Sequence, residues 1–211
     1  MTRQASARVL AAVCAVLLVL TAYANFFRND FHFDDSHVIV ENASIHSLQH
    51  WTRFFTDAHT FSSLPTNATY RPLVTLSFAL DYAVHQSLDP VPFHVTQLLL
   101  LLIVGALLAV VISLLFGRHH DLLAIAAAAI FCVHTANTET MNFLASRSEL
   151  ISALRQQGRV TSVPISSALT CAVIAMPPIL PPSPHPPRSG PSVRARECSR
   201  AADYVDPIAF A

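Results

Sequence analysis

Two adjacent carboxylates, Asp34 and Asp35, form the most distinctive acidic feature of the chain, in the string FHFDDSH. One carboxylate of such a pair can accept the proton of an attacking hydroxyl while the other holds the acceptor group in place. Alternatively, both can bind a divalent cation, or they can simply be solvated or cap a helix. The residue types alone leave these three alternatives open.

Histidine and cysteine are the other residue types whose chemistry could define a site. Seven of the 11 His lie between residues 32 and 94, and His32 and His37 flank the acidic pair. Imidazole and carboxylate both suit transition metals, but the irregular spacing lacks the His pairs typical of metal sites. The four Cys show no CxxC spacing, and two of them, Cys171 and Cys198, lie near the C-terminus. We therefore predict no metal ligands, although a metal-binding protein remains an alternative.

A second polar stretch, HTANTETMNFLASRSE at residues 134–149, follows an apolar run. Ionisable residues at a membrane boundary carry a functional hypothesis, with simple solvation as the alternative. Glu139 and Arg147 are eight residues apart, about two helical turns. We therefore expect that these two side chains could lie on one helix face.

The elements that must position these residues are membrane helices. Apolar residues make up 53% of the 211 residues and charged residues only 12%, about half the charged fraction of an ordinary soluble domain. The net charge is zero and the Arg residues are scattered, which excludes the basic footprint of a nucleic-acid-binding protein. The apolar residues are gathered in long runs, which indicates a membrane protein.

Three apolar runs could cross a bilayer. Residues 9–27 are long enough to span, either as an uncleaved anchor or as a signal peptide cleaved after Ala22-Tyr23-Ala24. Residues 95–116 carry no charge and form the clearest span. Residues 122–133 are too short alone, and cross only if their helix continues into the polar residues 135–140.

Arginine placement predicts the orientation of these spans. Arg3 and Arg8 precede the first run, and Arg118 lies between the second and third, so the positive-inside rule places all three on one side. The loop at residues 28–94 and the segment after the third run then lie on the other side. Two N-glycosylation sequons in that loop, Asn42-Ala43-Ser44 and Asn67-Ala68-Thr69, agree with a lumenal location.

Within the loop, the stretch LVTLSFALDYAVHQSL at residues 73–88 has apolar residues at helical intervals. This pattern predicts an amphipathic helix along the membrane surface, which Pro90 and Pro92 terminate. Residues 177–191 are rich in proline and predict polyproline II or disorder. The predicted fold class is all-α: an integral membrane helical bundle of about three spans, with a lumenal loop that contains the amphipathic helix.

Four strings occur in this order along the chain: FHFDD, YRPLVTLSFALDY, LDPVPFHVTQLLLLL and FCVHTANTETMNFLASRSELISAL. On these strings the chain resembles the N-terminal part of GT-C-type membrane glycosyltransferases. The closest group is the transmembrane and tetratricopeptide-repeat-containing (TMTC) O-mannosyltransferases, in which a stretch like FALHPVHTEAVNWIAGRSELLAAL follows the third span. The resemblance covers roughly residues 10–154. The residues that match this stretch in register are Phe131, His134, Thr138, Glu139, Asn142, Ala145, Arg147, Ser148, Glu149 and Leu150.

The resemblance implies a multi-pass protein of the endoplasmic reticulum membrane that moves mannose from a dolichyl-phosphate carrier to Ser or Thr hydroxyls of proteins in the lumen. Asp34 or Asp35 would be the general base of an inverting displacement, and Arg71 or Arg147 would meet the lipid phosphate. His134 and Glu139 are further candidates for substrate binding. The implied partners are membrane lipid, the lipid-linked sugar donor and an acceptor protein. No cofactor is implied, although a divalent cation could assist the leaving phosphate.

Some residues depart from the family pattern. Residues 134–137 read HTAN where the family has HPVH, and Ser146 stands where glycine is usual. Family members continue through many further spans, whereas this chain changes character at about residue 155. We expect residues 1–154 to be the transmembrane part of such an enzyme and residues 155–211 a Pro-rich, disordered tail unrelated to it. The prediction is an inactive or incomplete fragment; the alternative is a small non-enzymatic multi-span protein or interaction partner.

Overall fold

A computed structural model of the chain describes residues 2–162, and the regular secondary structure of these residues is helical, without a β-strand. The predicted all-α fold class is therefore confirmed. The predictions for the Pro-rich stretch at residues 177–191 and for Cys171 and Cys198 concern residues that lie outside the described part of the chain. Short 3-10 turns and one π-helical turn fill the segment between the first two α-helices. The α-helices of residues 2–162 are α1 (Thr2–Ala22), α2 (Pro72–His85), α3 (Pro90–Phe116), α4 (Asp121–Val133), α5 (Asn137–Asn142) and α6 (Arg147–Ser162).

Two helical segments are long and apolar enough to cross a membrane, Arg3–Arg28 and Pro90–Phe116. The second of these, α3, begins where the sequence predicts a break: the Asp89 side chain accepts a hydrogen bond from the Val91 N–H (2.9 Å), and Pro90 occupies the first turn. Gly117, at φ 89°, ends the helix in a conformation that favours glycine.

The third apolar run forms α4, which has 13 residues and is therefore about 20 Å long. Helical geometry ends at Val133, because His134 adopts an extended conformation with ψ 139°. The condition for this run to cross, a helix that continues into residues 135–140, is not met, since α5 is a separate short helix that begins at Asn137. Two spans are thus supported by length, and the third remains a prediction.

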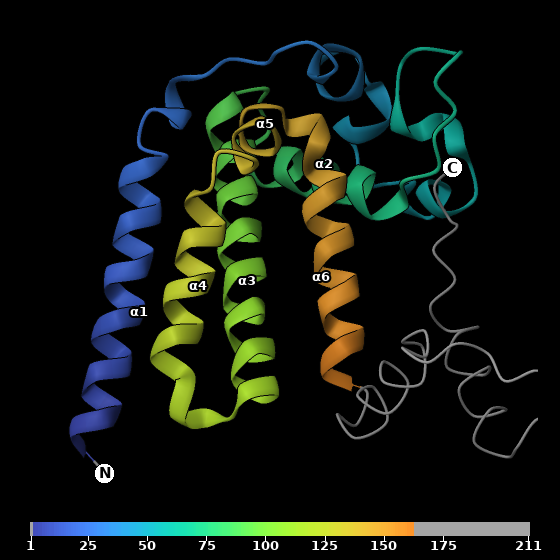
Figure 1. Cartoon of the computed structure of the whole chain (residues 1–211). Helices are drawn as coiled ribbons and strands as arrows, with labels where there is room; N and C mark the ends of the chain where they lie inside the picture. Colours follow the sequence, from blue (N-terminus) through green and yellow to red (C-terminus); the bar gives the residue numbers. More distant parts are fainter. Residues whose placement is uncertain (1, 163–211) are drawn as a thin grey trace, which may run out of the picture. The chain divides into compact units, whose positions relative to one another are not determined.

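Helices α1, α3 and α4 run side by side (Figure 1), and α4 contacts both α1 and α3. A Cβ atom at Gly105 of α3 would overlap the Cys132 Sγ of α4, so a larger residue at this contact would displace the Cys132 side chain or separate the helices. At one end, Arg8 of α1 forms an ion pair with Asp121 of α4 (3.0 Å). The pair shows that the start of α1 and the link between α3 and α4 lie at the same end of the helices. The positive-inside rule predicts this arrangement, because it places Arg3, Arg8 and Arg118 on one side of the membrane.

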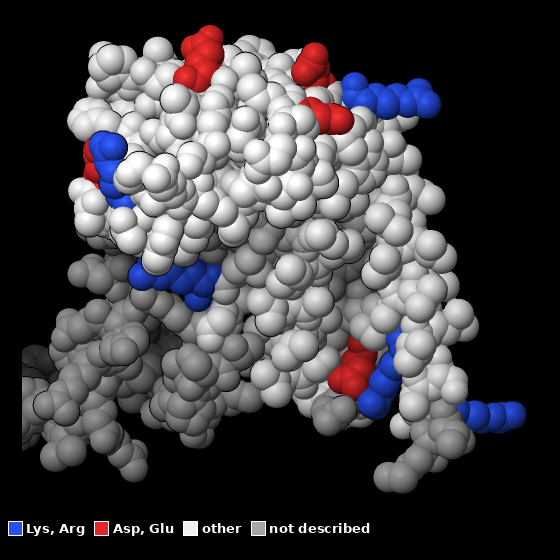
Figure 2. All heavy atoms as spheres, turned by 180° about the vertical axis from the view of Figure 1, so that it is seen from behind, with Lys and Arg blue, Asp and Glu red and all other residues white. Residues whose placement is uncertain are grey.

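The surface of the helices is apolar between their ends. Large hydrophobic side chains of α1, α3 and α4 are exposed, among them Val9, Leu10, Leu99, Phe116 and Ile130. Figure 2 shows, on one face of the described residues, charged side chains over the loop region and, at the lower right, at the opposite end of the helices. On the right of this view the stretch between them is uncharged, and a further basic side chain lies at mid-height on the left. This distribution fits helices surrounded by lipid hydrocarbon.

The loop region between α1 and α3 has its own hydrophobic core. Its short turns pack on α2, which runs crosswise to α3 in Figure 1. Helix α2 confirms the predicted helix, but its buried face includes Val74 and Phe78, while Leu73, Leu80 and Val84 form an exposed apolar stripe. The buried residues of this core are Val38, Ile39, Ile45, Phe54, Phe61, Val74, Phe78, Ala79, Phe93 and Leu144.

Candidate functional site

The two adjacent carboxylates have different environments. Asp35 is fully buried, and its Oδ1 accepts a hydrogen bond from the Ala145 N–H (2.7 Å) while its Oδ2 accepts one from the His32 N–H (3.2 Å). Burial raises the pKa of the Asp35 carboxyl above its ordinary value, and the backbone donors act against this rise. Asp35 therefore fastens the loop after α1 to the turn that precedes α6, 110 residues away.

Asp34 instead faces solvent, with 77% of its side chain exposed. Its carboxylate lies 3.4 Å from the His37 Nε2, and the His37 Nδ1 pairs with the Ser62 hydroxyl at 3.0 Å. The preceding residue, Phe33, has φ 50°, a left-handed conformation rarely adopted by a bulky residue. This strained backbone starts the turn from which the first carboxylate, Asp34, points outward and the next one, Asp35, points inward.

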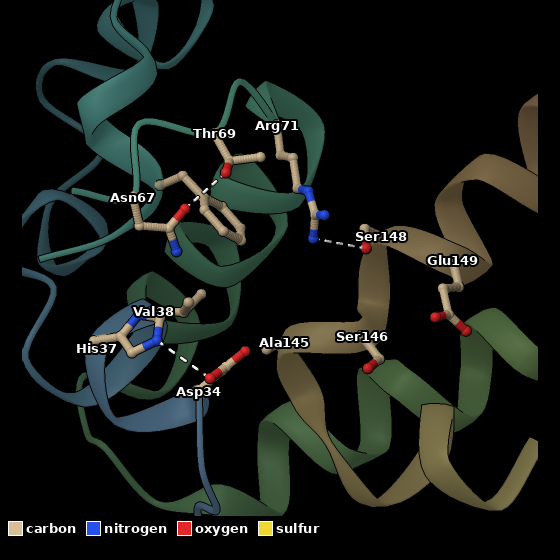
Figure 3. A pocket seen from close by; sticks show the side chains of 11 residues that line it. Asp34, His37, Val38, Asn67, Thr69, Arg71, Ala145, Ser146, Ser148 and Glu149 are labelled. Carbon is tan, nitrogen blue, oxygen red and sulfur yellow. Dashed lines mark hydrogen bonds and ion pairs between the residues drawn. The ribbon is translucent and has the colours of Figure 1, made fainter. Parts of the chain in front are cut away.

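Asp34 lies in the wall of a polar pocket of about 280 Å³ (Figure 3). The pocket is built from three parts of the chain: the turn after Asp34, the segment before α2, and the start of α6. Carboxylate, guanidinium, amide and hydroxyl groups face it together, which is the mixture expected for a polyhydroxylated or phosphorylated ligand. The lining residues are Asp34, His37, Val38, Phe61, Asn67, Thr69, Arg71, Ala145, Ser146, Ser148 and Glu149.

Arg71 lies across the pocket from Asp34 in Figure 3. Its guanidinium donates to the Ser148 hydroxyl (3.0 Å) and lies over the Phe61 ring, 5.2 Å from the centroid. Within residues 2–162, the bond to Ser148 is the one hydrogen bond of the Arg71 side chain, and Arg71 is exposed. Because a guanidinium carries five N–H donors, most of them remain available to an anionic group in the pocket.

Glu149 is a pocket residue that the sequence analysis did not select as a site residue. Its carboxylate accepts a hydrogen bond from the Thr140 hydroxyl at 2.6 Å and lines the wall formed by α6. The string RSE, which belongs to the best-matching block of the family resemblance, was the available signal. Ser146 and Ser148 also line the pocket and were not predicted, because a small hydroxyl residue by itself does not indicate a particular chemistry.

Arg147 does not line the pocket, because its side chain is fully buried on the other side of α6. The guanidinium donates to Asp81 (2.6 Å) and lies over the Phe78 ring at 4.4 Å. It also donates to the side chains of Gln97 and Ser77 and to the Phe93 carbonyl, at 2.9–3.1 Å. Burial lowers the pKa of Arg147 while Asp81 raises it. This network ties α6 to α2 and α3, so the geometry gives Arg147 a structural position.

Glu139 and His134 also lie outside the pocket wall, and both are exposed. The expectation that Glu139 and Arg147 share one helix face was wrong, because α5 ends at Asn142 and Phe143 is extended at φ −104°, ψ 112°. The His134 Nδ1 accepts a hydrogen bond from the Ala136 N–H at 3.1 Å, which caps a turn. Of the six predicted site residues, the pocket thus combines Asp34 and Arg71, while Asp35 supports it from behind.

No group of three or more His, Cys, Asp or Glu side chains within residues 2–162 is arranged to hold a metal ion. Two His side chains instead pack against aromatic rings: His46 of the loop region stacks on Tyr82, and His94 of α3 contacts the Phe26 ring.

Comparison with known proteins confirms the resemblance to a class of membrane glycosyltransferases, and within it to the TMTC protein O-mannosyl-transferases. The chain is 31% identical over 152 residues to human protein O-mannosyl-transferase TMTC4, which covers 65% of this chain and 20% of that protein. It is 32% identical over 150 residues to the mouse TMTC4 (64% and 20%) and 31% identical over 142 residues to Xenopus laevis tmtc2 (65% and 16%). No family model and no solved structure matches the chain. The chain spans a fifth or less of the length of these relatives.

Proposed function

We propose that this chain forms part of a protein O-mannosyltransferase site, which moves mannose from a dolichyl-phosphate carrier to a Ser or Thr hydroxyl in the lumen of the endoplasmic reticulum. The observation that carries the proposal is the pocket in which the exposed Asp34 carboxylate and the Arg71 guanidinium face one space. The names of the relatives support the sugar and the protein acceptor.

Asp34 is the general base in this proposal. The acceptor hydroxyl oxygen attacks the anomeric carbon of the donor sugar, the bond from that carbon to the phosphate oxygen breaks, and the hydroxyl proton passes to Asp34. His37, which lies 3.4 Å from the carboxylate, orients it. A single displacement inverts the anomeric configuration and needs no nucleophile on the protein. Asp35 is a positioning residue, because its two oxygens are occupied by backbone N–H groups.

Arg71 binds the leaving phosphate. Charge-assisted hydrogen bonds from a guanidinium to phosphate oxygens are stronger than neutral ones, and this guanidinium has donors to spare beside its bond to Ser148. The charge that develops on the phosphate as the glycosidic bond breaks is thereby stabilised. Glu149 and the nearby hydroxyls hold the sugar hydroxyls.

The proposal places the loop region on the lumenal side of a multi-pass membrane protein. The Arg8–Asp121 end of the helices then faces the cytoplasm. The exposed stripe of Leu73, Leu80 and Val84 on α2 rests on the lumenal membrane surface. A pocket of about 280 Å³ holds a sugar phosphate but not an isoprenoid chain as well. Membrane lipid and further helical surface must accommodate the carrier.

A non-enzymatic role beside a longer relative is the second candidate. The large apolar side chains exposed along α1 and α3 favour it, because such faces can pack against additional helices as well as against lipid. In this role the chain associates with a transferase without catalysing transfer.

The division into residues 1–154 and 155–211 also stays a proposal, and α6 continues without a break past Leu154 to Ser162.

A transfer assay separates the two candidates. Microsomes that contain the chain are incubated with dolichyl-phosphate mannose and an acceptor protein, and mannose on the acceptor is measured. We expect Asp34→Asn to lower transfer by about 10²–10⁴-fold, the usual contribution of a general base. The matched control is Glu41→Gln, an exposed carboxylate outside the pocket, which should leave transfer unchanged. The enzymatic role is refuted if the unmutated chain shows no transfer in an assay in which a longer relative, tested in parallel, is active.

A further inference from the structure

The two glycosylation sequons of the loop region occupy opposite environments. Asn42 is only 2% exposed, and its side-chain amide is fully engaged. The two Nδ2 hydrogens serve three backbone carbonyls, those of Val38 (3.1 Å), Thr60 (3.0 Å) and Phe61 (3.1 Å). The Oδ1 accepts a hydrogen bond from the Ser44 N–H at 3.1 Å. A sugar on this nitrogen would remove the buried network, so the folded chain cannot carry one.

Asn67 is partly exposed, in a turn of irregular backbone between the short helices and α2. Its backbone N–H donates to the Leu64 carbonyl (3.0 Å), and its Oδ1 accepts a hydrogen bond from the Thr69 hydroxyl (2.7 Å). Among residues 2–162, no partner engages its Nδ2, and the flanking Thr66 and Ala68 are exposed. The nitrogen and the hydroxyl two residues later, which glycosylation requires, are both accessible.

We propose that Asn67, and not Asn42, is the N-glycan acceptor of this chain. The inference rests on the lumenal location in the proposed function. The Asn67 Nδ2 attacks the anomeric carbon of a lipid-diphosphate-linked oligosaccharide on the host's transferase. The bond from that carbon to the phosphate oxygen breaks, the lipid diphosphate leaves, and the amide gives up one proton to a base of the host enzyme. The fold selects between two sequons that are equivalent as sequence.

The position of Asn67 gives the modification a consequence for the pocket. Figure 3 shows the Asn67 side chain in the pocket wall, with Asp34 and Arg71 facing the same space. The first sugar of the glycan therefore starts at the pocket rim. Because the pocket measures only about 280 Å³, a glycan that starts in its wall is large enough to narrow its entrance. The glycosylated chain should thus admit ligands to the pocket less readily than the unmodified chain.

The test is a mobility shift on enzymatic deglycosylation of the full chain expressed in cells. Thr69→Ala removes the second sequon, and Ser44→Ala removes the first one while leaving the Asn42 amide and its bonds in place. We expect a shift of one glycan for the unmutated chain, the same shift for Ser44→Ala, and none for Thr69→Ala or Asn67→Gln. A shift that is lost in Ser44→Ala, or two glycans on the unmutated chain, overturns the proposal.

An additional acceptor separates failure of this inference from failure of the proposed location. His50 is exposed in the same loop region and precedes Trp51-Thr52, so His50→Asn creates a third sequon by one substitution. We expect this variant to carry one glycan more than the unmutated chain. A glycan on His50→Asn alone overturns the assignment of Asn67 while the lumenal location stands. No glycan on either chain overturns the assignment together with the location.

Discussion

The buried ion pair between Arg147 and Asp81 allows the sharpest quantitative prediction about stability. Asp81→Ala removes the carboxylate that lies 2.6 Å from a guanidinium with 0% exposure. Breaking such a pair by deleting one partner costs about 3–5 kcal/mol, because a buried charge loses its compensation. The Thr96 hydroxyl, which donates to the same carboxylate at 2.6 Å, also loses its acceptor. Since domains are stable by only about 5–15 kcal/mol, much of the stability of the loop region depends on this pair.

The assay is urea unfolding of the full chain in mild detergent micelles, followed by the helical circular dichroism signal. Asp81→Ala should lower the unfolding free energy by about 3–5 kcal/mol. The matched control is Arg53→Ala, which breaks the exposed Arg53–Asp57 pair at 3.1 Å and should change stability too little to resolve.

A double variant tests the physical reason. Replacing both partners by apolar residues, Asp81→Leu with Arg147→Met, removes the uncompensated charge. We expect it to be more stable than Asp81→Ala alone. Recovery should be partial, because Gln97 and the Phe93 carbonyl still lose their donor. The reasoning is refuted if Asp81→Ala is as mild as Arg53→Ala, or if the double variant is less stable than Asp81→Ala.

Three further predictions concern packing, pH and the buried amide. Gly105→Leu forces α3 away from Cys132 and should cost about 1–3 kcal/mol in the same unfolding assay, whereas unchanged stability would contradict the close contact. Because burial raises the pKa of Asp35 in the folded state, the unfolding free energy should fall as pH rises from below the ordinary aspartate pKa through the raised value. Asp35→Asn should flatten this dependence, and identical pH profiles would argue against it. Asn42→Ala removes the amide that donates to three carbonyls and should cost about 1–3 kcal/mol, while Ser44→Ala serves as the neutral comparison.

Apolar patterning predicted the parts of the fold that depend on local sequence. The uncharged stretch at residues 95–116 lies within α3, and the helix starts at the proline where the pattern predicted a break. The extended backbone at Phe143, which separates Glu139 from Arg147, was not predictable from spacing. It depends on contacts of the turn at residues 144–146 with parts of the chain that lie far away in sequence, including the bond from Ala145 to Asp35.

The candidate site shows the same limit. Adjacent residues of one type, Asp34 and Asp35, differ in burial because a backbone N–H 110 residues away selects one of them. Likewise Arg147 points into the core while the next residue, Ser148, faces the pocket. Local sequence identifies residues with suitable chemistry, but the face of the protein that each one reaches is decided by long-range packing.

The bond between Asp35 and Ala145 also sets an order of events during synthesis. The partners of the Asn42 amide lie within 19 residues of it, so its network can close soon after this part of the chain emerges. The far wall of the pocket, at residues 145–149, follows Asn67 by about 80 residues. At about 5–20 residues per second this interval lasts roughly 4–16 s. During that time the network of the first sequon has the partners that it needs to close, while the second sequon is exposed beside a half-built pocket. The timing of translation therefore favours the same choice as the finished structure.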